Sequence, residues 1–141
     1  MNIVIIGLPG SGKTHLSKTF PNHIIFDDFI STLFDGKLQK YIKNDVPVCI
    51  NDPRLCDINI YNKYDFSNFK LILFENNYEQ CLENIKLRNN PRFEISLKHL
   101  SEKYDLDNYS NYQLVPVYKL NYKLNYKLNY KLNYKLNYKP I

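Results

Sequence analysis

The segment Gly7–Thr14 constrains the fold of this chain more than any other stretch. Its sequence, GLPGSGKT, fits the spacing G-x-x-x-x-G-K-[ST]. It follows an apolar run rich in β-branched residues, Asn2–Ile6, and opens a segment able to form a helix ending near Phe20. Glycines tolerate the positive φ angles that turn successive backbone N–H groups toward a phosphate. The order strand, glycine-rich loop and helix therefore predicts a phosphate-binding loop.

Two side chains of this loop have specific expected roles. Lys13 is expected to reach the β- and γ-phosphates of a nucleotide as a point charge, and the Thr14 hydroxyl to occupy one position on a Mg²⁺ ion. A nucleotide and Mg²⁺ are thus the ligands expected from the loop. A chance match in a glycine-containing turn is the alternative, which the position of the motif between strand and helix disfavours. The expected nucleotide-binding residues are Gly7, Leu8, Pro9, Gly10, Ser11, Gly12, Lys13 and Thr14.

Strand signals alternate with helical periodicity through residues 1–117. Helices are expected over Phe29–Lys43, weakened in its middle by Gly36, over Tyr78–Arg88 and, after a break at Pro91, over Ser96–Tyr104. Alternation of this kind predicts an α/β fold with a parallel sheet of about five strands. The expected strands are Asn2–Ile6, His23–Phe26, Pro47–Ile50, Phe69–Phe74 and Tyr112–Val117.

Acidic residues follow the second and third expected strands. In open α/β sheets, ligands bind beyond the carboxyl ends of the strands. Asp52 could hold Mg²⁺ through water, and Asp27 or Asp28 could accept the proton of a substrate hydroxyl. Turn or capping chemistry is the alternative for each, because Asp is common where a strand meets a helix.

Arginine is rare in this chain, so its positions are informative. Arg88 and Arg92 flank residues 89–91 between two expected helices, where a guanidinium could clamp a transferring phosphoryl group. Interaction with the terminal carbonyls of a helix is the alternative. Arg54 follows the third strand and could contact either a substrate or its own loop. Structural roles are expected for the three histidines, which lack metal-ligand spacing: His15, His23 and His99.

The net charge of +5 comes from the C-terminal end of the chain. All acidic residues lie before residue 115, whereas the segment 118–141 repeats Tyr-Lys-Leu-Asn five times and carries six lysines. A four-residue period indicates low complexity. This Lys/Tyr tail could contact single-stranded nucleic acid weakly. Expansion of a short DNA repeat is the favoured alternative, and a chain ending at Val117 is expected to keep its fold.

Composition bears on location. Cys49, Cys56 and Cys81 lack zinc-site spacing, so buried thiols in a reducing compartment are expected. The start of the chain has no charged leader followed by a long apolar segment. An intracellular, cytoplasmic protein without a membrane partner is expected.

Three segments together carry a family resemblance: Gly7–Thr14, the strand ending at Asp27-Asp28, and residues 76–92. They resemble the small P-loop kinases of the polynucleotide-kinase and zeta-toxin type over most of residues 1–105. The resemblance implies the three-layer P-loop NTPase fold with strand order 2-3-1-4-5, ATP with Mg²⁺, and lid arginines at Arg88 and Arg92. It also implies that the Asp ending strand two activates the acceptor. Polynucleotide kinases often place a basic residue three positions after that Asp, where this chain has Ile30.

The expected function is ATP-dependent transfer of the γ-phosphate to a hydroxyl of a small molecule, a nucleoside or nucleotide, or a nucleic-acid end. The expected catalytic residues are Lys13, Asp27, Arg88 and Arg92, with Thr14 and Asp52 at the metal. The alternative is a P-loop protein that binds nucleotide without transfer, as a switch or a degenerate remnant.

Overall fold

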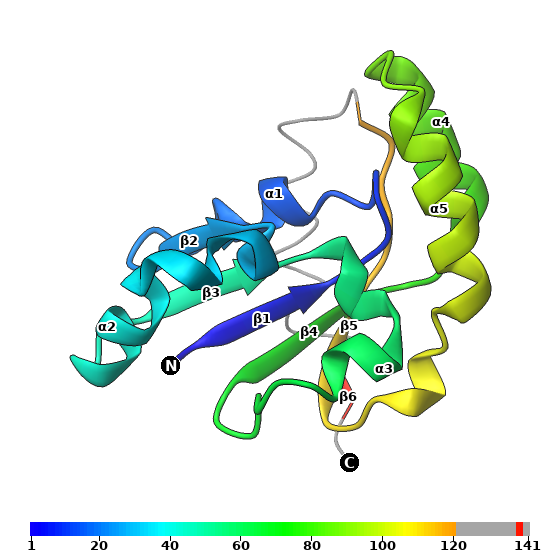
Figure 1. The fold of residues 1–141 in the computed structure, drawn as a ribbon. Helices are drawn as coiled ribbons and strands as arrows, with labels where there is room; N and C mark the ends of the chain where they lie inside the picture. Colours follow the sequence, from blue (N-terminus) through cyan, green and yellow to red (C-terminus); the bar gives the residue numbers. More distant parts are fainter. Residues whose placement is uncertain (121–137, 140–141) are drawn as a thin grey trace.

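The computed structural model describes residues 1–120 and 138–139 (Figure 1). Most of the predicted Tyr-Lys-Leu-Asn tail, with its expected nucleic-acid contact, lies outside the described residues. Figure 1 shows a central twisted sheet with helices packed around it.

Five parallel strands form the centre of the fold, in the order β2-β3-β1-β4-β5. The α/β class, the parallel pairing and the strand order are confirmed. The strands are β1 (Ile3–Ile6), β2 (Ile24–Asp27), β3 (Val48–Asn51), β4 (Lys70–Phe74) and β5 (Tyr112–Val115).

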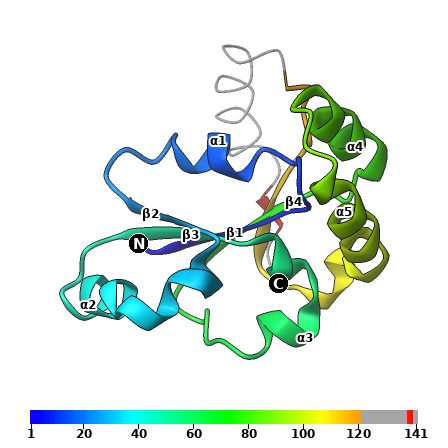
Figure 2. The ribbon, with the colours of Figure 1, turned by 45° about the horizontal axis from the view of Figure 1, so that its top comes forward.

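Burial explains why these short segments become strands. Every residue of β1 and β3 is buried, as are the last four of β4, because helices cover the sheet on both sides. Figure 2 shows α1 (Lys13–Ser17) on one face and α2 (Lys37–Lys43) and α3 (Ile58–Tyr61) on the opposite face. The structure is consistent with a three-layer arrangement.

A sixth strand was not predicted. β6 (Tyr138–Lys139) pairs antiparallel with β5, and Lys139 lies opposite Tyr112. The contact adds two residues of the C-terminal end to the edge of the sheet. The predicted boundary at residue 117 therefore does not mark the last described contact of the chain.

The predicted helix over Phe29–Lys43 is wrong in its first half. The structure has a 3₁₀ helix, η1 (Phe29–Asp35), and then α2. Gly36 separates them with φ 72°, a left-handed conformation that ends one helix and admits a new start. The Asp35 carboxylate accepts a hydrogen bond from the Lys37 N–H at 3.0 Å.

The other helices also differ from prediction in their bounds. α1 ends at Ser17, before Phe20. α5 (Arg92–Lys103) begins directly after Pro91, because proline lacks an N–H and is tolerated where a helix starts. α4 (Tyr78–Leu87) agrees closely with its prediction. Three short helices were not predicted: η2 (Pro53–Cys56), α3, and η3 (Leu106–Asn108).

Candidate functional site

The loop between β1 and α1 requires glycine at several positions. Gly10 and Gly12 have φ angles of 82° and 104°, which side chains with a Cβ resist. A Cβ at Gly10 would lie 2.6 Å from the carbonyl oxygen of Cys81 in α4. The loop is thus pressed against α4 and keeps a conformation that only glycine adopts without strain.

Asn84 of α4 fixes this loop in place. Its side chain is 1% exposed, and Nδ2 donates to the carbonyl oxygens of Gly10 and Tyr118, both at 2.9 Å. Its Oδ1 accepts from the Leu120 N–H at 3.1 Å. One buried amide therefore joins the loop, α4 and the chain that leaves β5.

Lys13 is a buried ammonium without a carboxylate partner. It is 8% exposed, and Nζ donates to the Leu8 carbonyl oxygen at 2.9 Å. No ion pair with Lys13 is found among the described residues. Burial lowers the pKa of Lys13, because desolvation disfavours its charged form.

The thiols near Lys13 do not neutralise it. Burial raises the pKa of Cys81 to about 12 and that of Cys56 further, so both thiols are protonated at neutral pH. The Lys13 side chain is therefore bonded to a carbonyl oxygen and lies near neutral thiols, and the carboxylates of Asp28 and Asp52 act on it without an ion pair among the described residues. An anionic ligand would complement this environment.

A cavity of about 230 Å³ lies beside this loop, at the carboxyl ends of the strands. It brings together six predicted site residues, together with Asp28, the alternative to Asp27. The six are Pro9 and Gly10 from the loop, Lys13 and Thr14 from the start of α1, Asp27 from β2 and Arg88 from the end of α4. The other lining residues are Asn51, Pro53, Ile85, Asn90 and Phe93.

Asp27 is held by the neighbouring strand. Asp27 and Asn51 are register partners at the ends of β2 and β3, and Asn51 Nδ2 donates to Asp27 Oδ1 at 2.6 Å. Asn51 is 2% exposed, so its amide has little freedom. This bond directs one carboxylate oxygen of Asp27 toward β3.

Asp52 makes contacts that favour a structural role over the predicted role at Mg²⁺. It is fully buried, and its two oxygens accept from Arg54 Nε at 2.9 Å and Nη2 at 2.7 Å. It also accepts from the backbone N–H groups of Arg54 and Ile30. Asp52 caps η2 and ties it to η1, and it does not line the cavity.

Two predicted arginines lie outside the cavity. Arg92 is exposed at the first position of α5 and is absent from the described residues that line the cavity. Arg54 pairs with Asp52 and donates to Ser31 Oγ at 3.1 Å, so it contacts its own surroundings. Of the three arginines, Arg88 is the one at the predicted site.

Sequence reasoning missed three lining residues that are chemically useful. Asn51 ends an apolar strand, a position that could have marked it as a partner of Asp27. Asn90 and Phe93 had no comparable signal, because their places depend on the turn between α4 and α5. In that turn Asn89 adopts φ 54°, which asparagine tolerates better than most residues.

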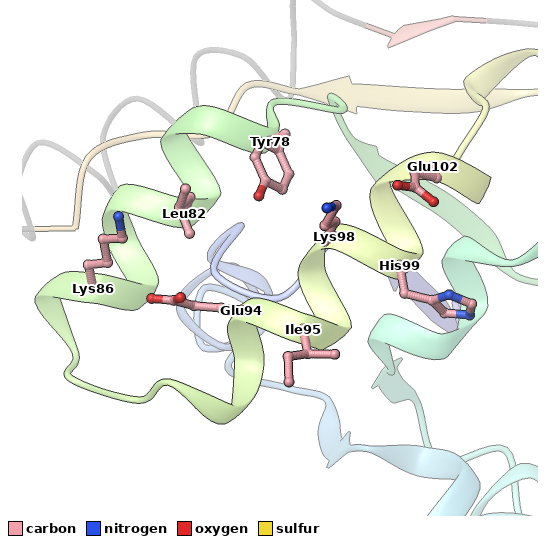
Figure 3. A pocket seen from close by; sticks show the side chains of 8 residues that line it. All are labelled: Tyr78, Leu82, Lys86, Glu94, Ile95, Lys98, His99 and Glu102. Atoms are coloured by element: carbon pink, nitrogen blue, oxygen red, sulfur yellow. The ribbon is translucent and has the colours of Figure 1, made fainter.

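A larger hollow, of about 490 Å³, lies between α4 and α5 (Figure 3). Tyr78 and Leu82 line it from α4, and Glu94 and Lys98 from α5. Its charges are of both signs, and none of the predicted site residues lines it. The smaller cavity at the strand ends is therefore the better candidate site.

The sequence is similar to a viral protein. "Uncharacterized protein R277" of Acanthamoeba polyphaga mimivirus is 40% identical over 124 residues, an alignment covering 78% of this chain and 90% of the viral protein. The chain belongs to the family of this mimivirus protein. No family model matches the sequence. The name of the mimivirus protein states no activity, so membership of this family carries no function over to the chain.

The described part of the chain lacks two features, a metal-binding cluster of side chains and a membrane-spanning helix. Across residues 1–120 and 138–139, no three His, Cys, Asp or Glu side chains gather where they could share a metal ion. Within the same ranges, no helix combines the length and apolar character needed to cross a membrane.

Proposed function

We propose that this chain is a P-loop phosphotransferase that binds ATP with Mg²⁺ and transfers the γ-phosphate to a hydroxyl acceptor. The observation that carries the proposal is the buried side chain of Lys13, which has no ion-pair partner among the described residues and lies beside a loop with two left-handed glycines. The polyphosphate of a nucleotide would offer anionic oxygens in direct contact with Lys13 and with the backbone N–H groups of the loop.

The residues around the cavity divide the work of phosphoryl transfer. Lys13 would bind the β- and γ-phosphates, and Arg88 would stabilise the charge that develops on the γ-phosphoryl group. Asp27 would accept the acceptor's proton, with Asn51 as its positioning residue. These groups line one cavity, as a reaction that depends on positioning requires.

The residues present fit Mg²⁺ in a limited way. The Thr14 hydroxyl lines the cavity and is a hard oxygen ligand. Mg²⁺ commonly takes few protein ligands and completes its shell with phosphate oxygens and water. When bound, it would offset the charge of the β- and γ-phosphates.

The proposed transfer forms one bond at the γ-phosphorus and breaks another. The acceptor oxygen forms a bond to the γ-phosphorus while the bond from that phosphorus to the β–γ bridging oxygen breaks. The hydroxyl proton passes to the Asp27 carboxylate, and ADP leaves with the electron pair of the broken bond. Asn51 leaves one oxygen of Asp27 for this proton, since its amide occupies the other.

Transfer from γ-labelled ATP to a panel of hydroxyl acceptors tests this function. Asp27→Asn should lower turnover by about 10²–10⁴-fold, the usual contribution of a general base, while ATP affinity is retained. Asp107→Asn, on exposed η3, is the matched control and should keep full turnover. Tight ATP binding without transfer to any acceptor would leave a nucleotide-binding protein and exclude the kinase.

A further inference from the structure

Positive and negative side chains come from different elements around the cavity. The phosphate loop and the end of α4 contribute the cations Lys13 and Arg88, whereas the end of β2 contributes the carboxylates of Asp27 and Asp28. The two cations are on the elements that would hold the donor phosphates. An acceptor approaching Asp27 therefore meets negative charge.

The Asp28 side chain makes no capping hydrogen bond to η1 and lines the cavity. The residue adopts φ 47° and ψ 49°, a left-handed conformation uncommon for residues other than glycine. It is exposed and acts electrostatically on both Lys13 and Arg54. Strain of this kind is found where a side chain is needed at a site.

Arg54, a further cation in η2 directly after the lining residue Pro53, is already paired with a carboxylate. Arg54 makes a two-pronged ion pair with the fully buried carboxylate of Asp52, with Nη2 2.7 Å from Oδ2. A guanidinium held in this way is not available to bind a phosphate on the acceptor. Among the described residues that line the cavity, no cation lies beyond Lys13 and Arg88.

We propose that the acceptor is an uncharged polyhydroxyl compound of nucleoside or monosaccharide size, and that Asp28 excludes phosphorylated acceptors. The inference rests on the proposed function. Repulsion between like charges weakens binding, so the Asp28 carboxylate would select against an acceptor that carries a phosphate. Amides of Asn51 and Asn90 can bond to hydroxyls, and Phe93 and Pro53 give a ring an apolar wall.

The size of the cavity agrees with a small acceptor. Its volume of about 230 Å³ is below the ~300–1,000 Å³ that encloses a drug-sized ligand. A cavity of this size would hold the γ-phosphoryl group and the acceptor hydroxyl, and the rest of the nucleotide and of the acceptor would extend beyond its opening. A nucleic-acid end would bring further phosphates toward Asp27 and Asp28.

The test compares matched acceptors that differ in charge. Nucleosides and hexoses are assayed with γ-labelled ATP beside nucleoside 3′-monophosphates and hexose 1-phosphates, which keep the acceptor hydroxyl. The best neutral acceptor should have kcat/KM at least about ten-fold above its phosphorylated counterpart. Asp28→Asn should narrow this ratio several-fold, mainly through the KM of the phosphorylated member, whereas Asp107→Asn should leave it unchanged.

Each other outcome overturns the inference. Equal or greater kcat/KM for the phosphorylated members, or for a 5′-hydroxyl oligonucleotide, would refute it and leave the kinase function intact. If Asp28→Asn leaves the ratio of kcat/KM between neutral and phosphorylated acceptors unchanged, the inference is also refuted. Bound ATP without transfer to any acceptor would remove the transferase function and the inference together.

Discussion

At the scale of single residues, Lys13 combines a stability cost with a binding role. Its pKa is lowered by burial, so the folded state disfavours the charged form relative to the unfolded state. The cost is fully present at pH values below the lowered pKa of Lys13 and diminishes as the pH rises from that pKa toward the ordinary lysine value. It disappears as the pH rises above the ordinary lysine value. A group retained at such a cost is typical of a functional site.

Lys13→Met should therefore stabilise the protein in the absence of nucleotide. Methionine fills a similar volume without a charge, and Leu8 O keeps its bond from the Ser11 N–H at 3.0 Å. The free energy of unfolding should rise by about 1 kcal/mol, and the thermal midpoint measured by circular dichroism should rise by a few degrees. Lys43→Met, exposed at the end of α2, should shift the midpoint little. A lower midpoint for Lys13→Met would contradict this account of its burial.

A pair of substitutions distinguishes the contribution of the Asp52–Arg54 ion pair to stability from a role of Asp52 at Mg²⁺. Arg54→Leu should destabilise by about 3 kcal/mol, since it leaves a buried carboxylate without its main partner. Asp52→Asn should cost less, because no buried charge remains, and it should leave the Mg²⁺ dependence of ATP binding unchanged. Urea unfolding and a Mg²⁺ titration measure these effects. A marked shift in Mg²⁺ dependence in Asp52→Asn would restore the metal role predicted from the sequence.

At the scale of elements, α4 packs so closely against the loop between β1 and α1 that a single added methyl group at Gly10 would clash. Gly10→Ala would force a Cβ to within 2.6 Å of the Cys81 carbonyl oxygen, in addition to the strain of φ 82°. Gly36→Ala is the matched control, because its φ of 72° is similar and nothing lies within 4 Å of the added Cβ.

Gly36→Ala should cost about 1–2 kcal/mol, the penalty of the left-handed conformation. Gly10→Ala should cost more, by roughly 2 kcal/mol or above, because the neighbour is backbone and overpacking adds to the strain. Urea unfolding of both variants gives the comparison. Equal losses would show that α4 moves aside freely and that the loop is not clamped.

Elements of this fold differ in how far the sequence predicts them. The strands were predictable because their apolar runs are buried on both faces and bounded by polar residues, as in β1 and β3. The helix over Phe29–Lys43 failed because apolar spacing does not reveal a left-handed Gly36. The glycine-rich turn between β1 and α1 was predictable from local sequence, and phosphate binding by it stays a prediction. Asn84, Asn90 and Phe93 lie at contacts between elements, which one sequence does not disclose.

At the scale of the whole molecule, the folded body continues past Val117. Asn84 bonds to the backbone of Tyr118 and Leu120, and Lys119 pairs with Glu83 at 3.2 Å. A chain ending at Val117 loses these contacts and leaves the buried Asn84 amide with fewer partners. This result modifies the expectation that truncation at Val117 is harmless.

A chain ending at Leu120 should keep nearly full stability, because it loses only the two-residue pairing of β6 among the described contacts. A chain ending at Val117 should be less stable by about 2 kcal/mol, the cost of lost hydrogen bonds to a buried amide. Urea unfolding of both chains and the full chain tests this. Identical midpoints for the two truncations would show that the bonds of Asn84 to 118–120 contribute nothing to stability.

Calorimetric titration with ATP in Mg²⁺ measures whether the cavity beside Lys13 binds the phosphates of a nucleotide. The full chain should bind, and folded Lys13→Met should bind at least about ten-fold more weakly, a loss of 1.4 kcal/mol or more. Lys43→Met should bind like the parent chain. An absence of binding by the parent chain, or equal affinity in Lys13→Met, would show that Lys13 does not hold the phosphates of a nucleotide.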